Sequence, residues 1–431
     1  VGMGPKLLSV VAAAAGVSCW GGDVGDRRPE LRCVYPPSAF LKSGGPVIDV
    51  TRSPFNAAGD GKTDDTAALV RAYDYVQQRL PPGPEFGIEG AYILYLPKGT
   101  YLVSDTIVYS GPLQHWMRTH LGFNEQCGQI RFVGESREQT VIRLRDRCPG
   151  FGENAYWAYP EVAEADRDHY RDKRRSIEAA ARERRGRPVL AFGKGNFNNA
   201  VAWNALRNLT INTGSGNPGA VGVDFCGANN TGIRNVTIRS GDGRGRIGLH
   251  VRIPPSMGYH RDLTVEGFDI GIRLFPYHMT HNSFEYVTLR RQREAGMAIV
   301  DSTASIRRLL SENRVPAVRQ EGPGSQAVVL DSRFVAPEGG GDAAMQVDAG
   351  YCFVRDLATE GYAAALAGGE KRMQGPTVRE FVNGPVFGAP DATSLRLPVE
   401  ELPLPKPVRS VSEWTDVTAF GAAGDGESDD T

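Results

Sequence analysis

The sequence predicts an all-β protein, a right-handed parallel β-helix with an N-terminal capping helix. Two observations carry this prediction: a short strand motif recurs between residues 205 and 360, and a second strand motif recurs in step with it. The glycine content agrees, because 52 of 431 residues are glycine, about 12% against a usual ~7%, and a coil of stacked rungs needs many tight turns.

The first motif reads Arg207-Asn-Leu209-Thr-Ile211 in its first copy. Alternation puts the apolar residues on one face of the strand and the threonines on the other. The central apolar residue recurs at spacings of 27, 27, 24 and 22 residues, at Leu209, Val236, Leu263, Val287 and Leu309.

The second motif begins with a small residue and repeats every 21–26 residues. Two strand series that share one period indicate rungs that bury their apolar side chains inward and pair with their neighbours. The coil is expected to be right-handed, as parallel crossovers normally are. The copies are Gly222-Val-Asp224, Gly248-Leu-His250, Gly271-Ile-Arg273, Gly296-Met-Ala298 and Ala317-Val-Arg319.

A helix is predicted over residues 66–80, ahead of the first strands. Asp64 is a suitable N-cap, and Pro81-Pro82 ends the helix. Because the open end of a β-helix must be covered, we expect this helix to lie over the N-terminal end of the coil. The acids Asp60, Asp64 and Asp65 are then architectural, and calcium binding is the alternative.

A sequence repeat sets the expected domain organisation. Residues 49–66 recur at 416–431, and the two copies align without gaps from Phe55 and Phe420 onward. The predicted order is an N-terminal segment with a signal peptide (1–45), a β-helix domain (46–395) with a charged helical insertion at about 160–187, a proline-rich linker (396–413) and the truncated start of a second β-helix domain (414–431).

The N-terminal segment, the net charge and the cysteines limit where the protein is expected and what it is expected to bind. An apolar run, residues 7–17, follows Lys6 and precedes Cys19, which is typical of a signal peptide with a possible lipid anchor and predicts a secreted, periplasmic or cell-surface protein. A net charge of −1 gives no basis for binding nucleic acid or a membrane surface. The six cysteines contain no CxxC motif, and no metal or cofactor is predicted. Cys127 and Cys148 are either a disulfide or isolated thiols.

The outward positions of the second motif form the candidate site. Asp224, His250, Arg273 and Arg319 are expected along one exposed face, with Arg252 one outward position further on, and such side chains bind sugar hydroxyls or uronate carboxylates. The turn at residues 240–245 adds Asp242 and Arg244. Asp224 and Asp242 are predicted as catalytic carboxylates and the others as substrate-binding residues. The alternatives are a solvated sheet face and an acid that only shapes its turn.

The opening motif, its helix and the segment Tyr95-Leu-Pro-Lys-Gly-Thr-Tyr-Leu-Val resemble the pectate-lyase-like β-helix superfamily, in the branch of rhamnogalacturonase- and epimerase-like domains, the family 28-related glycosyl hydrolases. The resemblance covers about 46–395 and implies a carbohydrate-active protein. The catalytic motifs of polygalacturonases and calcium-dependent pectate lyases are absent, so no catalytic residue is carried over. The tandem start is similar to laminarin-degrading exo-glucanases, which implies a second β-helix domain as partner.

Three functions follow as hypotheses. The first is a glycoside hydrolase, or half of one, that acts on an extracellular polysaccharide. The second is a polysaccharide lyase on uronate polymers, with a basic residue such as Arg273 as the proton acceptor. The third is a non-catalytic glycan-binding β-helix module.

Overall fold

The structure is a computed structural model of the 431-residue chain. It describes residues 47–79, 93–110, 130–157, 186–192, 204–227, 231–252, 257–274, 281–368, 371–384, 417–423 and 428. The predicted signal segment, nearly all of the charged insertion, the proline-rich linker and much of the second repeat copy lie outside these residues.

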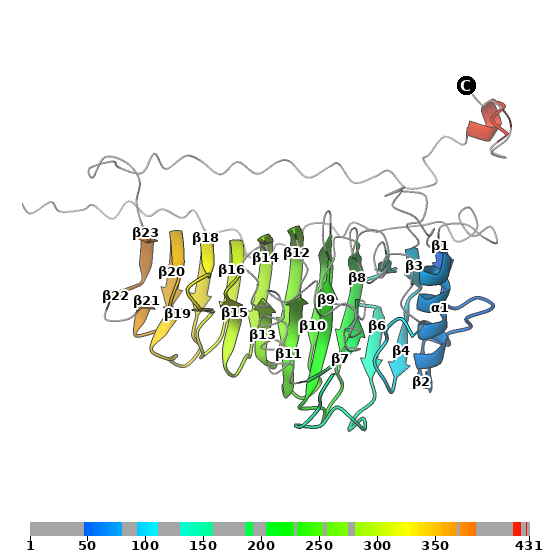
Figure 1. The fold of residues 1–431 in the computed structure, drawn as a ribbon, viewed down its shortest axis with the longest axis horizontal. Helices are drawn as coiled ribbons and strands as arrows, with labels where there is room; N and C mark the ends of the chain where they lie inside the picture. The colour runs from blue at the N-terminus through cyan, green and yellow to red at the C-terminus, as the bar shows by residue number, and fades with distance from the viewer. Residues whose placement is uncertain are drawn as a thin grey trace, which may run out of the picture. The chain divides into compact units, whose positions relative to one another are not determined.

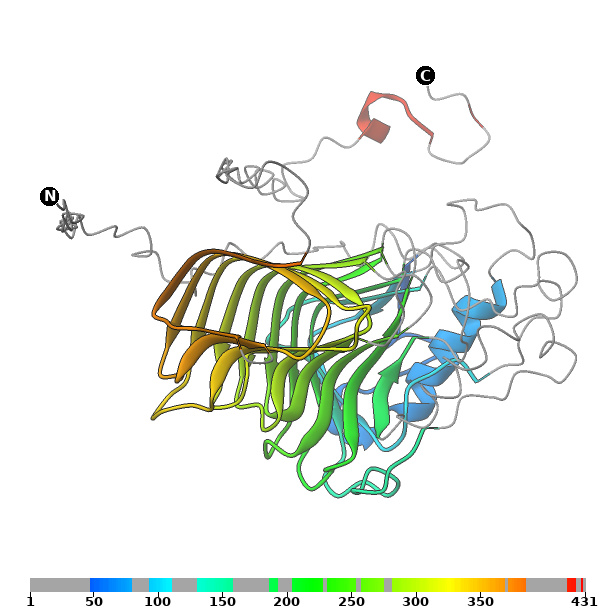
Figure 2. The same ribbon diagram turned by 60° about the vertical axis from the view of Figure 1, so that its left-hand side comes forward.

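Two long sheets of stacked strands build the coil (Figures 1 and 2). Nearly all neighbouring strands pair in parallel, which confirms the predicted parallel β-helix. The nine-stranded sheet, called sheet B, contains β7 (Arg187–Ala191), β9 (Ala220–Cys226), β11 (Gly245–Arg252), β13 (Phe268–Leu274), β15 (Ala295–Val300), β17 (Val318–Glu321), β19 (Ala343–Val347), β21 (Ala364–Gly368) and β22 (Lys371–Met373).

The fourteen-stranded sheet, called sheet A, carries the first sequence motif. Its strands are β1 (Val47–Asp49), β2 (Asp60–Asp64), β3 (Ile93–Leu96), β4 (Gly99–Val103), β5 (Arg131–Gly134), β6 (Thr140–Leu144), β8 (Ala205–Asn212), β10 (Gly232–Arg239), β12 (Met257–Glu266), β14 (His281–Arg290), β16 (Thr303–Glu312), β18 (Gln326–Val335), β20 (Tyr351–Glu360) and β23 (Thr377–Asn383).

Each long strand of sheet A is bent at one residue. β5 pairs with the first half of β8 and β6 with the second half, so sheet A has two faces joined at a corner. The residue at the corner has a positive φ, as at Asn208 (53°) and Asn235 (54°), and the Asn235 amide donates to Asn208 Oδ1 at 3.1 Å. The later corner residues are Asp262, Tyr286, Arg308, Asp331 and Asp356.

The glycines of the second motif allow sheet B to approach the second half of sheet A. A Cβ atom added at Gly222 would lie 2.3 Å from Ile238 Cγ2, and one at Gly248 would lie 2.2 Å from Val265 Cγ1. Real Cβ atoms do not come this close, so any larger residue would push the two sheets apart.

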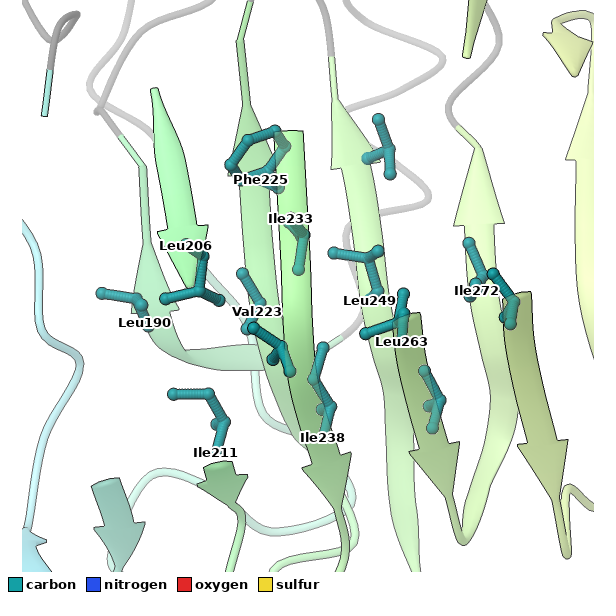
Figure 3. Packing of buried hydrophobic residues seen from close by; sticks show 14 of the residues in the cluster. Leu190, Leu206, Ile211, Val223, Phe225, Ile233, Ile238, Leu249, Leu263 and Ile272 are labelled. Atoms are coloured by element: carbon teal, nitrogen blue, oxygen red, sulfur yellow. The ribbon is translucent and has the colours of Figure 1, made fainter. Parts of the chain in front are cut away.

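Apolar side chains from both sheets fill the inside of the coil (Figure 3). A row of aromatic rings runs along this core with neighbouring centroids 4.8–5.7 Å apart, and it begins at Tyr73 of the helix. Its members are Tyr73, Phe132, Phe192, Phe225, His260 and Phe284.

Helix α1 (Thr66–Arg79) covers the N-terminal end of the coil, as predicted (Figure 1). The expected N-cap is displaced by one residue, because the Leu69 amide donates to the Asp65 carbonyl and makes Asp65 the N-cap. The Asp65 carboxylate instead holds the amides of Ala58 and Gly59, while Asp64 accepts the amide and hydroxyl of Thr66. Both acids therefore shape the cap.

The other end of the coil is closed by a reversal of the chain. β23 pairs antiparallel with β20, and β22 pairs antiparallel with β21. These two strands are the points where the parallel stacking of the described residues stops (Figure 1).

Cys148 is a buried free thiol whose Sγ lies 3.0 Å from the Ser104 carbonyl oxygen, and burial raises its pKa. This favours the isolated-thiol interpretation for Cys148. Cys127 lies outside the described residues.

Candidate functional site

The outward row of sheet B is present in the register that the sequence predicts. His250 of β11 pairs with Asp224 of β9 on one side and with Arg273 of β13 on the other. The row continues through Ala298 to Arg319. Because neighbouring strands lie about 4.8 Å apart, Asp224, His250 and Arg273 occupy three successive rungs of one face.

Asp224 and His250 form the closest charged pair of this row. Asp224 Oδ1 lies 3.7 Å from His250 Nδ1, and the two side chains are 4% and 12% exposed. The carboxylate faces Nδ1 of the ring, so Nε2 lies on the side of the imidazole away from Asp224.

The two arginines of the row differ in their surroundings. Arg273 is partly exposed next to His250 in the register. The Nε of Arg319 is bound by the Glu321 carboxylate, and Ala298 separates Arg319 from Arg273. Arg273 is therefore the arginine that accompanies the Asp224–His250 pair. Arg252 pairs with Cys226 at the end of β11, and its side chain lies outside the described part of the protein.

Asp242 is engaged in its own turn. Its carboxylate accepts hydrogen bonds from the amides of Gly216 (2.6 Å) and Arg244 (3.1 Å) and from the Ser240 hydroxyl (3.1 Å). Burial acts to raise the pKa of Asp242, but these hydrogen bonds outweigh it and lower the pKa. In the structure the Asp242 carboxylate therefore shapes its own turn, which was the alternative to a catalytic role.

The structure does not bring Asp242 and Asp224 together. The Ser240–Arg244 turn precedes β11, whereas the residue opposite Asp224 is His250, five residues after the first residue of β11. At about 3.3 Å per residue these five residues span roughly 16 Å, beyond the ~5–9.5 Å between paired catalytic carboxylates. Arg244 lies at the same far end of the strand, so it does not join the row.

A second charged cluster lies on the outward face of the first half of sheet A. The Tyr259 hydroxyl donates to Glu285 (2.5 Å) and accepts from Arg261 (3.0 Å), and Arg307 contacts both Glu285 (3.6 Å) and Asp331 (3.1 Å). As a sequence pattern, the recurring arginine of the first motif marks only the position of each rung. Its outward position next to a buried apolar residue is the signal that could have identified this cluster.

Among the residues that the structure describes, no three His, Cys, Asp or Glu side chains are grouped so as to hold a metal ion. None of the described helices has the length and apolar character needed to cross a membrane.

A sequence profile of the family described as rhamnogalacturonase A/epimerase, pectate lyase-like, matches residues 50–306. The chain belongs to this family. It is a carbohydrate-active β-helix family, and the match covers α1, sheet A from β2 to the start of β16, and sheet B from β7 to β15. A comparison with curated protein sequences found no match.

Several solved structures resemble the chain at low identity. The A-module of a mannuronan C-5 epimerase from Azotobacter vinelandii is 16% identical, with a TM-score of 0.42 over 74% of this chain and 78% of that module. A Geobacillus virus E2 protein is 13% identical (TM-score 0.37; 73% of this chain, 47% of that protein). The catalytic unit of an α-1,3-glucanase from Streptomyces thermodiastaticus is 12% identical (TM-score 0.39; 76% of this chain, 66% of that unit). The chain thus spans less than two thirds of the last two proteins.

Proposed function

We propose that the chain acts on an extracellular polysaccharide that contains uronate residues, and that the reaction begins by removing the proton next to the uronate carboxyl group. The observation that carries this proposal is the row Asp224–His250–Arg273, which places an acid, an imidazole and a guanidinium on three successive rungs. The family description, which includes epimerases, supports the same class of chemistry.

Each residue of the row has a role in this reaction. His250 accepts the proton from C5 of the uronate, and Asp224 stabilises the imidazolium that forms. Arg273 binds the uronate carboxylate and stabilises the negative charge that the carboxylate gains when C5 loses its proton. The electron pair left at C5 has two outcomes. It forms a C4–C5 double bond as the C4–O bond breaks and the leaving oxygen takes a proton, or C5 receives a proton on the opposite face.

Glycoside hydrolysis is the second candidate. Asp224 is a carboxylate on the same row, and the family description includes rhamnogalacturonase. Hydrolysis needs a second carboxyl group about 5–9.5 Å away, which Asp242 does not supply. In this case we propose that the second acid comes from a partner β-helix domain.

The products distinguish these reactions. The purified chain is incubated in D2O with polygalacturonate, polymannuronate, rhamnogalacturonan and laminarin. Elimination gives unsaturated sugars that absorb in the ultraviolet, and epimerisation gives deuterium at C5 in nuclear magnetic resonance spectra. New reducing ends with neither signal on any uronate polymer identify hydrolysis and contradict proton abstraction. Binding without turnover on every polymer identifies a non-catalytic module and contradicts both reactions.

Two substitutions test the assignment of the residues. We expect His250→Gln to lower kcat on the uronate polymer about 10²–10⁴-fold with little change in KM, because general base catalysis contributes this much. Asp224→Asn should lower kcat as well, since it removes the charge beside the imidazolium. Arg333→Ala is the control, because Arg333 forms an exposed ion pair with Glu360 on sheet A. A His250→Gln variant as fast as the wild type would overturn the assignment.

A further inference from the structure

Three successive rungs of sheet A carry an arginine at the same register. Arg207 of β8 pairs with Arg234 of β10, which pairs with Arg261 of β12. Each follows a buried residue, so all three side chains lie on the outward face. Their backbones are about 4.8 Å apart from rung to rung, which places three positive charges in one line.

The three arginines of this line differ in how many acidic side chains lie beside them. Arg261 has two acids beside it, Asp262 at 3.4 Å and Glu285 at 3.5 Å. Within the described part of the chain, Arg207 and Arg234 have no carboxylate partner, and the buried Nε of Arg207 has no hydrogen-bond partner. The Arg234 guanidinium lies over the Tyr259 ring, 5.1 Å from its centroid.

Other arginines lie close to this line. Arg137 donates to Asn235 and Thr237 of β10 and to Thr264 of β12. Burial lowers the pKa of Arg234, and the charges of Arg207 and Arg261 lower it further. On the later rungs this register holds Glu285 and then Arg307, whose charge is balanced by Glu285 and Asp331. Among the described residues of this register, the uncompensated charge is therefore local to Arg207 and Arg234.

We propose that Arg207 and Arg234 form a second binding site, which holds an oxyanion group of an acidic polysaccharide, a carboxylate or a sulfate. Guanidinium groups bind such groups in a bidentate manner, and two of them one rung apart present parallel donors. The Tyr259 ring offers an apolar edge for the sugar that carries the anion. The site belongs to sheet A rather than to the Asp224–His250–Arg273 row, so it binds the polymer without taking part in the reaction.

The double variant Arg207→Gln/Arg234→Gln tests this site. Oligogalacturonate and a sulfated oligosaccharide are titrated by calorimetry into the full chain, with a neutral glucan as the reference. We expect the double variant to bind the acidic ligand at least about tenfold more weakly, because it loses two charged hydrogen-bond donors. The control Arg290→Gln/Arg333→Gln removes the same charge from sheet A at arginines paired with Glu312 and Glu360, and should bind like the wild type.

Thermal unfolding gives a second measurement. Without ligand, the double variant should melt at or above the wild-type temperature, because like charges opposite each other on neighbouring strands are destabilising. The acidic oligosaccharide should raise the melting temperature of the wild type by more than that of the double variant, which keeps only the Asp224–His250–Arg273 row.

Each result of these experiments either supports or overturns the proposed site. If the double variant loses binding of just one of the two acidic ligands, that ligand shows whether the site prefers a carboxylate or a sulfate. Either result supports the site. Equal weakening in the control variant, equal binding of the neutral glucan, or no binding to the wild type overturns it. An Arg273→Ala variant separates this site from the proposed function, since it should lower turnover of the uronate polymer, while adding Arg207→Gln/Arg234→Gln to it should still weaken binding of the acidic ligand further.

Discussion

His260 is a histidine enclosed by aromatic rings in the middle of the coil. Its side chain is fully buried, stacks on Phe284 with centroids 4.8 Å apart, and makes a T-shaped contact with Phe225. Burial lowers the pKa of His260 from 6.5 to about 4, and the hydrogen bond to Asn282 only partly offsets this. The neutral ring is therefore the form that the folded protein holds.

This residue makes stability depend on pH. In the unfolded chain His260 takes up a proton below pH ~6.5, whereas the folded chain takes it up only near pH 4. The folded state should therefore lose up to about 3 kcal/mol as the pH falls through this window. We expect His260→Phe to remove this part of the dependence, measured as the free energy of unfolding in denaturant at pH 7 and 4.5. His281→Gln at an exposed position is the control, and an unchanged slope in His260→Phe would contradict the explanation.

Some features of the candidate site could be predicted from the sequence, and others could not. Asp224, His250 and Arg273 could be placed on one face because they share a position within the repeated motif. The role of Asp242 could not, because it depends on where β11 begins and on a contact with Gly216, 26 residues earlier in the chain. The charge balance around Arg207 and Arg234 could not be predicted from the sequence either, because it depends on which acids lie on neighbouring rungs.

At the scale of elements, the glycines of sheet B determine how closely two strands of one rung approach. Gly248 lies between Val265 of sheet A and the Gly271 carbonyl of the next rung, at 2.2 and 2.7 Å from where a Cβ would lie. The second motif thus begins with a small residue because of packing, and not because a turn is needed there.

Gly248→Ala should therefore destabilise the protein by about 1–3 kcal/mol, the usual effect of overpacking a core. Gly152→Ala is the matched control, because nothing lies within 4 Å of the added Cβ. Denaturant unfolding of both variants measures the difference. Equal stability of the two would show that the sheets can separate without loss of packing.

The corner of sheet A was not predicted from the sequence, although each strand of the motif was. The corner position is occupied by Asn, Asp, Tyr and Arg in different rungs, so residue type alone does not mark a positive φ there. The strand pairing reveals the corner, because the two separate strands β5 and β6 both pair with the one continuous strand β8.

At the scale of the whole molecule, the aromatic row connects the cap to the rungs. Tyr73 of α1 contacts Phe132, and the contacts continue through Phe192 and Phe225 to His260. In stacked folds each rung is stabilised mainly by its two neighbours, so the loss of one ring should weaken nearby rungs more than distant ones.

Phe225→Ala tests this coupling. We expect a loss of about 3–5 kcal/mol from the cavity. Hydrogen exchange followed by mass spectrometry should show faster exchange in β7, β9 and β11 and little change in β18 and β20. Tyr351→Ala, at a side chain that is 52% exposed, is the control. Uniform acceleration along the whole coil would show that it unfolds as a single unit.

The reversal at β22 and β23 also changes the edge that the described coil presents at this end. A parallel coil that stopped at β20 would offer a row of unpaired amides and carbonyls to any further strand. β23 takes up that row in the opposite direction and places polar residues such as Arg379 and Glu380 at the new boundary, while α1 occupies the opposite end. We therefore expect a second coil, if it binds, to lie against the flanks of this one rather than to extend its sheets.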